Sequence, residues 1–105
     1  MRLPGRLRST LDQLIELAIR LQTEAGEFLE HPEEQQEWYN RGYANGVVTA
    51  LNELGYAEYI GGRVSADAED LLAEQKMLAW GQAYQHGMEM GNKETREVIS
   101  PAPGQ

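Results

Sequence analysis

Few of the side chains in this sequence belong to the types that usually carry catalysis. It has no cysteine, and its two histidines, His31 and His86, are far apart along the chain. None of the serines, at positions 9, 65 and 100, lies in the Gly-x-Ser-x-Gly pattern of a nucleophilic serine. Neither histidine follows a glutamate by three residues, as the ligand pairs of a di-iron helical bundle do. We therefore expect a protein that is not an enzyme and that uses no cofactor.

Paired carboxylates leave one catalytic alternative open. Glu34 with Glu37, and Asp67 with Asp70, have the i, i+3 spacing that places two side chains on one face of a helix. If the two pairs faced one another, they could hold a magnesium ion, as in helical nucleotide pyrophosphohydrolases. Both pairs also fall in the expected first turns of helices, where acidic residues stabilise the helix dipole without any further role. A magnesium-dependent nucleotide hydrolase is therefore kept as an alternative function.

Charge is distributed unevenly along the 105 residues, which carry a net charge of −8. Residues 1–20 hold four arginines against two acidic residues, whereas residues 21–97 hold five basic and fifteen acidic side chains. No lysine or arginine occurs between Arg20 and Arg41. Because phosphate contacts need clustered lysine and arginine, we do not expect direct binding to nucleic acid.

The acidic run that follows Arg20 has two interpretations. It can be a solvated surface that keeps the protein soluble, or a surface that docks on a basic face of a partner protein. We adopt the second interpretation, and an inhibitor that shields a nucleic-acid-binding protein is one concrete form of it. The carboxylates assigned to partner binding are Glu24, Glu27, Glu30, Glu34, Glu37, Asp67 and Asp70.

The spacing of apolar residues predicts an all-α fold, in which three long helices pack as a bundle in a single domain over residues 1–105. The helices are expected at about 10–29, 32–54, and from 66–67 to at least 92. Ser9 is the expected N-cap of the first helix, and Gly55 the expected C-terminal stop of the second.

Glycine and proline also predict the irregular parts of the chain. Gly61-Gly62, between short β-prone arms, predicts a short β-hairpin or a structured loop between the second and third helices. The first eight residues and residues 100–105 are expected to be flexible ends, because the last six include two prolines and a glycine.

The first predicted helix is apolar over a wide arc. Leu11, Leu14, Ala18 and Leu21 recur at three and four residues, and Leu17 extends the apolar surface beyond that stripe. A helix that is apolar this far round is usually covered on more than one side. We therefore expect a homo-oligomer, with a dimer as the simplest form, and a purely structural homo-oligomerising module is a second alternative function.

Aromatic and small residues recur between the second and third predicted helices at an offset of 41, which aligns Tyr39 with Trp80 and Tyr43 with Tyr84. A glycine inside a helix costs about 1 kcal/mol relative to alanine, and five glycines lie inside these two helices. Rows of small residues at i, i+4 can offset that cost because they let two backbones approach closely. We assign helix packing, within one chain or between two copies, to Gly42, Gly46, Ala50, Ala79, Ala83, Gly87, Gly91, Tyr39, Tyr43, Trp80 and Tyr84.

The recurrent Tyr-x-x-Gly pattern resembles helices of small phage and bacterial accessory proteins, and this resemblance implies no particular activity. No apolar run approaches the roughly 18 residues of a membrane-spanning helix. The arginines near the start are not followed by the apolar core of a secretory signal. We expect a cytoplasmic protein that does not bind membranes.

Overall fold

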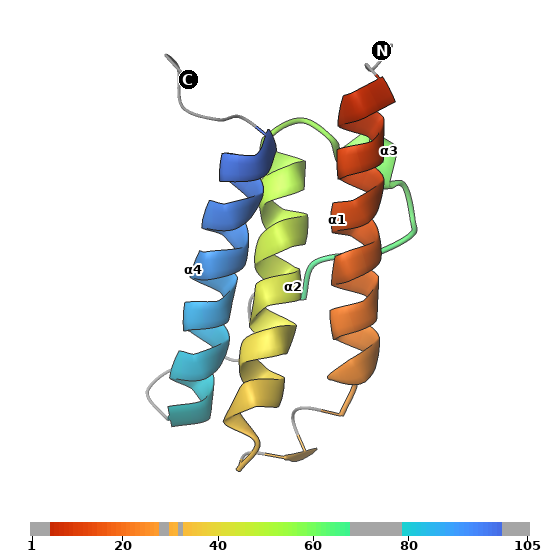
Figure 1. The fold of residues 1–105 in the computed structure, drawn as a ribbon. Coiled ribbons are helices and arrows are strands. Elements are labelled where there is room, and N and C mark those ends of the chain that lie inside the picture. The colour runs from red at the N-terminus through yellow and green to blue at the C-terminus, as the bar shows by residue number, and fades with distance from the viewer. Residues whose placement is uncertain (1–4, 28–29, 32, 68–78, 100–105) are drawn as a thin grey trace.

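The computed structural model describes residues 5–27, 30–31, 33–67 and 79–99. Within these residues the secondary structure is helical, with no strand, so the prediction of an all-α fold is confirmed for them. The helices are α1 (Gly5–Glu24), α2 (Gln35–Glu53), the short α3 (Ala57–Ile60) and α4 (Ala79–Ile99) (Figure 1).

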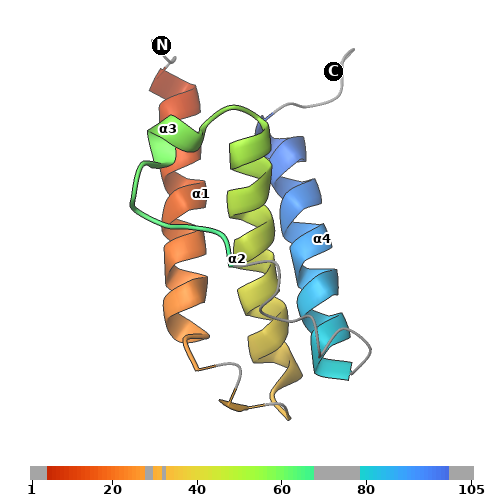
Figure 2. The same ribbon diagram turned by 180° about the vertical axis from the view of Figure 1, so that it is seen from behind.

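The three long helices form a layer with α2 in the middle. Helix α2 contacts both α1 and α4 over long stretches, whereas α1 and α4 scarcely touch each other. Helix α1 runs antiparallel to α2, and α4 runs in the same direction as α2 (Figure 1). Seen from behind, the chain after α3 crosses α1 and reaches α2 (Figure 2), so it covers one face of the layer.

Helix α1 begins earlier than the sequence predicted. Gly5 is its first residue, so residues 5–8, which were expected to belong to a flexible end, form the first turn of the helix. Ser9, the expected N-cap, lies inside the helix. Leu7 explains the additional turn, because it lies one turn before Leu11 and packs against the same buried cluster. Residues 1–4 and 100–105 lie outside the described part of the chain.

The main core lies between α1 and α2. The side chains of Leu11 and Ile15 are almost fully buried there, as are Val47 and Leu51 of α2. Burial of a large aliphatic side chain stabilises a fold by roughly 1.5–3 kcal/mol, so this cluster is what holds α1 on α2.

Helix α2 begins at Gln35, three residues later than expected. The residues before it form a turn around the His31 carbonyl, which accepts hydrogen bonds from the Glu34 N–H at 3.0 Å and from the Trp38 indole N–H at 3.0 Å. The predicted stop at Gly55 is confirmed. This glycine has a φ of 98°, a left-handed conformation that favours glycine at the end of a helix.

The expected hairpin at Gly61-Gly62 is wrong for the described residues, and a short helix stands in its place. The N–H of Gly61 donates to the carbonyl of Ala57 at 3.1 Å and closes the single turn of α3. Gly61 has a φ of 60°, which ends the helix. A left-handed glycine is common to hairpins and helix ends, and the arms here are too short to form a ladder.

The third long helix begins later than predicted. Ala66 and Asp67 are not helical, residues 68–78 lie outside the described part of the chain, and α4 runs from Ala79 to Ile99. The backbone N–H of Asp67 donates to the side chain of Asn45 at 2.8 Å. That bond holds Asp67 against α2 as part of the crossing segment rather than as the first turn of a helix.

Candidate protein-binding surface

Four glycines of α2 and α4 lie where the two backbones touch. A Cβ atom added to Gly42 or Gly46 would come well under 3.0 Å from main-chain atoms of α4. The same addition at Gly87 or Gly91 would come equally close to main-chain atoms of α2. The structure therefore brings the two glycine rows together within one chain, and no residue with a side chain fits at these four positions without moving a helix.

The contact repeats with an offset of 45 residues, not the 41 taken from the sequence. Gly42 faces the carbonyl of Tyr84, and Gly87 faces the carbonyl of Tyr39. In each helix the pattern is Tyr-x-x-Gly-x-x-x-Gly, beginning at Tyr39 in α2 and at Tyr84 in α4. The offset of 41 is wrong because it aligned aromatic side chains, whereas the contact depends on where a Cβ is missing.

The other residues assigned to packing surround this contact. Ala50 is fully buried, and Ala83 packs beside Tyr84. The Tyr39 ring lies 6.3 Å from the Tyr43 ring and 5.6 Å from that of His86. The hydroxyl of Tyr43 donates to Glu94 of α4, and burial followed by this hydrogen bond raises the pKa of Tyr43. Ala79 and Trp80 begin α4, and their side chains lie outside the described part of the structure.

A buried polar network joins the crossing segment to α2 and α4. The Arg41 guanidinium donates to both carboxylate oxygens of Asp67, at 2.7 and 3.1 Å, and also to the carbonyl of Gln22 at 3.1 Å. The Tyr84 hydroxyl donates to Asp67 at 2.6 Å. Burial, and then the bond to Asp67, raise the pKa of Tyr84. Paired groups of this kind fix the position of a segment.

The network corrects the role predicted for Asp67. Only 7% of its side chain is exposed, and its carboxylate is paired with Arg41, so it cannot serve as part of an open acidic surface or as a free magnesium ligand. Asp70, its expected companion, lies outside the described residues. The sequence analysis gave no role to Arg41 or Asn45, which hold Asp67 in place. The sequence signal was weak: Arg41 is the one arginine of α2, and Asn45 stands between Ala44 and Gly46 in its stretch of small residues.

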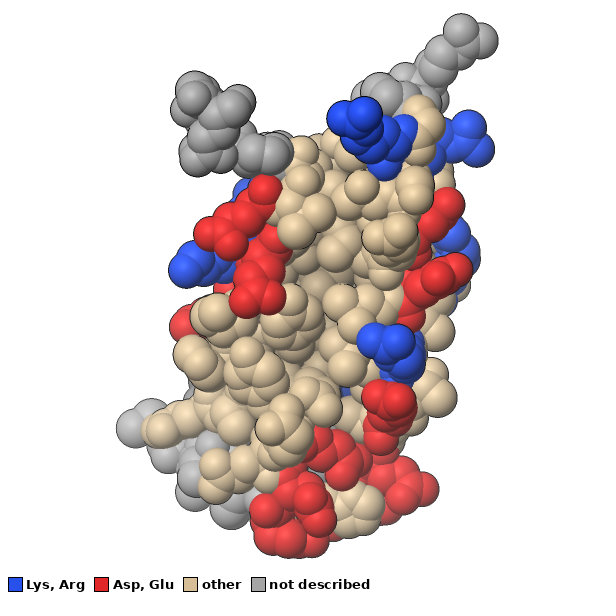
Figure 3. Space-filling model, viewed as in Figure 1, with Lys and Arg blue, Asp and Glu red and all other residues tan. Residues whose placement is uncertain are grey.

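The other five carboxylates assigned to partner binding gather at the end of the molecule where α1 passes into α2. Glu24, Glu27, Glu30 and Glu34 are exposed, and the neighbouring Glu33 is exposed as well. Figure 3 shows acidic side chains concentrated at the lower end of the molecule. We call this group, Glu24, Glu27, Glu30, Glu33, Glu34 and Glu37, the acidic end.

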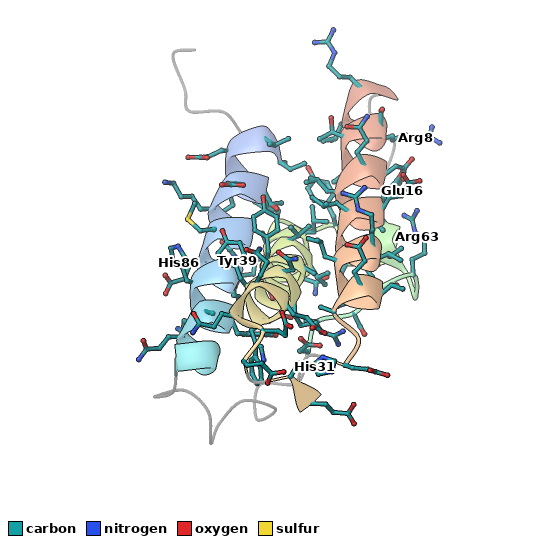
Figure 4. All side chains as sticks on the ribbon, turned by 60° about the horizontal axis from the view of Figure 1, so that its bottom comes forward. Arg8, Glu16, His31, Tyr39, Arg63 and His86 are labelled. Carbon is teal, nitrogen blue, oxygen red and sulfur yellow. The ribbon has the colours of Figure 1, made fainter. Side chains whose placement is uncertain are left out.

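Glu37 differs from the rest of the acidic end because it has an internal partner. Its carboxylate lies 3.3 Å from Nδ1 of His31, which sits at the near end of the molecule in Figure 4. The hydrogen bond to Glu37 is the main reason that the pKa of His31 is raised above 6.5, and the charges of Glu33 and Glu27 add to it. When protonated, His31 contributes the single positive side chain between Arg20 and Arg41.

Within the described residues, no group of three or more histidine, cysteine or acidic side chains is arranged to hold a metal ion. The carboxylate of Glu37 is paired with His31 and that of Asp67 with Arg41, so each already has a partner within the chain. None of the helices that the structure describes has the length and apolarity needed to cross a membrane.

Comparison with known proteins adds no relative: no family model, curated protein or solved structure matches this chain.

Proposed function

We propose that this protein acts by binding a basic surface of another protein through its acidic end. The supporting observation is the concentration of five exposed carboxylates, at Glu24, Glu27, Glu30, Glu33 and Glu34, in a stretch that contains no lysine or arginine. Complementary charge of this kind steers association and favours a basic partner over others.

A concrete form of the proposal is an inhibitor that covers the nucleic-acid site of its partner. Sites that bind nucleic acid present lysine and arginine to phosphates. Exposed carboxylates along a turn can occupy the same basic groups, and the partner would then release its nucleic acid. On this proposal the affinity falls steeply with salt, since exposed charges are screened beyond about 8–10 Å at physiological ionic strength.

The test compares variants that remove the same number of charges from different places. Glu27, Glu30 and Glu34 are replaced together by glutamine, which leaves the pairing of Glu37 with His31 intact. A matched control replaces three exposed carboxylates elsewhere, Glu58, Glu89 and Glu97, by glutamine. Immobilised wild type, variant and control are used to capture proteins from the native host at low and high salt.

We expect wild type and control to capture the same basic protein with equal affinity, and the acidic-end variant to bind it at least tenfold more weakly. Affinity measured against the isolated partner should fall with salt for wild type and much less for the variant. Equal binding by all three proteins, or binding that does not depend on salt, would refute the acidic end as the binding surface.

A further inference from the structure

The described residues leave one face of the three-helix layer open. The other face is covered by the segment that follows α2, where the Tyr59 hydroxyl donates to Asp12 at 2.7 Å and the Gln22 side chain donates to the Ser65 carbonyl at 2.9 Å. Asp12 and Gln22 therefore mark the covered side of α1. The opposite side of the same helix carries no such segment among the described residues (Figures 1 and 2).

Apolar side chains of α1 lie on the open side. A residue in an α-helix turns by about 100° from the one before it, which places Leu14, Leu17 and Leu21 on the flank away from Asp12 and Gln22. All three leucines remain partly exposed. The view in Figure 3 shows a broad uncharged area on this face between charged margins. The open side of α1 is thus an apolar stripe with a charged border.

The charges that border this stripe oppose the dipole of α1. The first turn of the helix has no acidic residue and the last turn has no basic residue. Instead Arg6 lies near the positive end of the dipole and Glu24 near its negative end, and both placements are unfavourable in an isolated helix. Neither side chain forms an ion pair with another described residue.

Arg6 and Glu24 are placed symmetrically about the middle of α1. Arg6 and Glu24 are 18 residues apart, which is five helical turns, so both lie on one line along α1. Their midpoint is residue 15. The midpoint of Leu14 and Leu17 lies within one residue of the midpoint of Arg6 and Glu24. The apolar pair and the charged pair are therefore centred on the same level of α1. A surface with this property is complementary to itself when two copies meet antiparallel.

We propose that a second copy of this chain covers the open face, with the two α1 helices antiparallel about an axis on the open side of α1, level with position 15 along the helix. Leu14 then packs against Leu17 of the partner subunit, and Arg6 pairs with Glu24 of the partner subunit at each end. This pairing leaves Glu27, Glu30, Glu33 and Glu34 of the acidic end exposed for a basic partner protein. The antiparallel arrangement also places each end of α1 beside the opposite end of the partner dipole. Arg6 and Glu24 interact unfavourably with the dipole of their own helix. In the dimer each also lies beside the opposite end of the partner dipole, and that interaction is favourable.

The first test is the molar mass in solution, measured by sedimentation equilibrium over a wide concentration range. The mass should rise from 11.8 kDa towards twice that value. Leu17→Lys should hold the mass at that of one chain. Thr23→Lys is the matched control, because it adds the same charge to an exposed position of α1 turned about 120° from Leu17, and it should still dimerise.

The second test exchanges the charges and does not depend on the apolar core. Arg6→Glu and Glu24→Arg should each weaken dimerisation about tenfold, because each places like charges together at two symmetric contacts. The double variant should recover wild-type affinity, with the helical content of all variants checked by circular dichroism. A wild type that stays monomeric at every concentration, a Leu17→Lys variant that dimerises normally, or a double variant as weak as the single ones would overturn the proposal.

Discussion

Replacing Gly46 by alanine is the sharpest test of the contact between α2 and α4. Alanine is the better helix former by about 1 kcal/mol, so an exposed helical glycine would be improved by this change. Gly46 instead faces the main-chain carbonyl of Met88 and the main-chain nitrogen of Asn92. Main-chain atoms in the middle of a helix cannot move aside as the end of a side chain can, so the two helices must separate.

The expected loss follows from these two opposing effects. The added Cβ would lie under 3.0 Å from the α4 backbone, and the helices must part until that distance reaches the 3.4–4 Å of ordinary contact. Overpacking costs about 1–3 kcal/mol where neighbours can relax, and a rigid backbone on both sides places this site at the upper end. After subtracting the gain in helix propensity, we expect a net loss of about 2 kcal/mol.

Urea denaturation followed by circular dichroism measures this loss. For a domain of this size the midpoint should fall by about 1–2 M. Gly5→Ala is the control, since Gly5 is also helical and a Cβ there would meet nothing within 4 Å. The control should be as stable as wild type or slightly more so. A Gly46→Ala variant with a midpoint at or above that of wild type would refute direct contact between the backbones.

Three other substitutions test separate contacts. Thr95, one turn after Gly91, has a buried hydroxyl without a hydrogen-bond partner among the described residues, so Thr95→Val should raise the stability to urea by about 1 kcal/mol. Arg41→Met removes the positive partner of the largely buried Asp67 carboxylate, which keeps its hydrogen bond from Tyr84, and should cost about 3 kcal/mol in the same assay. Glu37→Gln should move the raised pKa of His31 back towards 6.5 in an NMR titration. Because that pKa is raised by folding, the pair stabilises wild type below pH 6.5 and its contribution disappears as pH rises through the raised pKa. A lower midpoint for Thr95→Val, an unchanged one for Arg41→Met, or an unchanged His31 titration would contradict the corresponding contact.

The role of the glycines of α2 and α4 in close helix packing could be predicted from the sequence. The reason is that the free-energy cost of a glycine inside a helix depends only on the helix that contains it. Several glycines inside apparent helices are too unfavourable to persist unless close packing offsets them. Which glycines face which could not be predicted in the same way. The choice between an offset of 41 and one of 45 depends on how the two helices are shifted along each other, and no pattern within either helix fixes that shift.

The burial of Asp67 shows a second limit. In the sequence it stands among other acidic residues, and a run of like charges usually lies in solvent. Its partner Arg41 is 26 residues earlier, and no local pattern links the two. The acidic end was easier to predict, because a run of glutamates with no nearby basic residue has few internal partners available. Within the acidic end, Glu37 is the carboxylate that has such a partner, because it pairs with His31.

The parallel course of α2 and α4 has a consequence for the order in which this chain folds. Helices α1 and α2 are joined by residues 25–34, a short connection that closes at little entropic cost, whereas α2 and α4 are separated by residues 54–78. Contact through glycines gives little stabilisation until the two backbones are in register, because each glycine must face a main-chain carbonyl of the other helix. We therefore expect the α1–α2 hairpin to form early and the arrival of α4 to be the rate-limiting event.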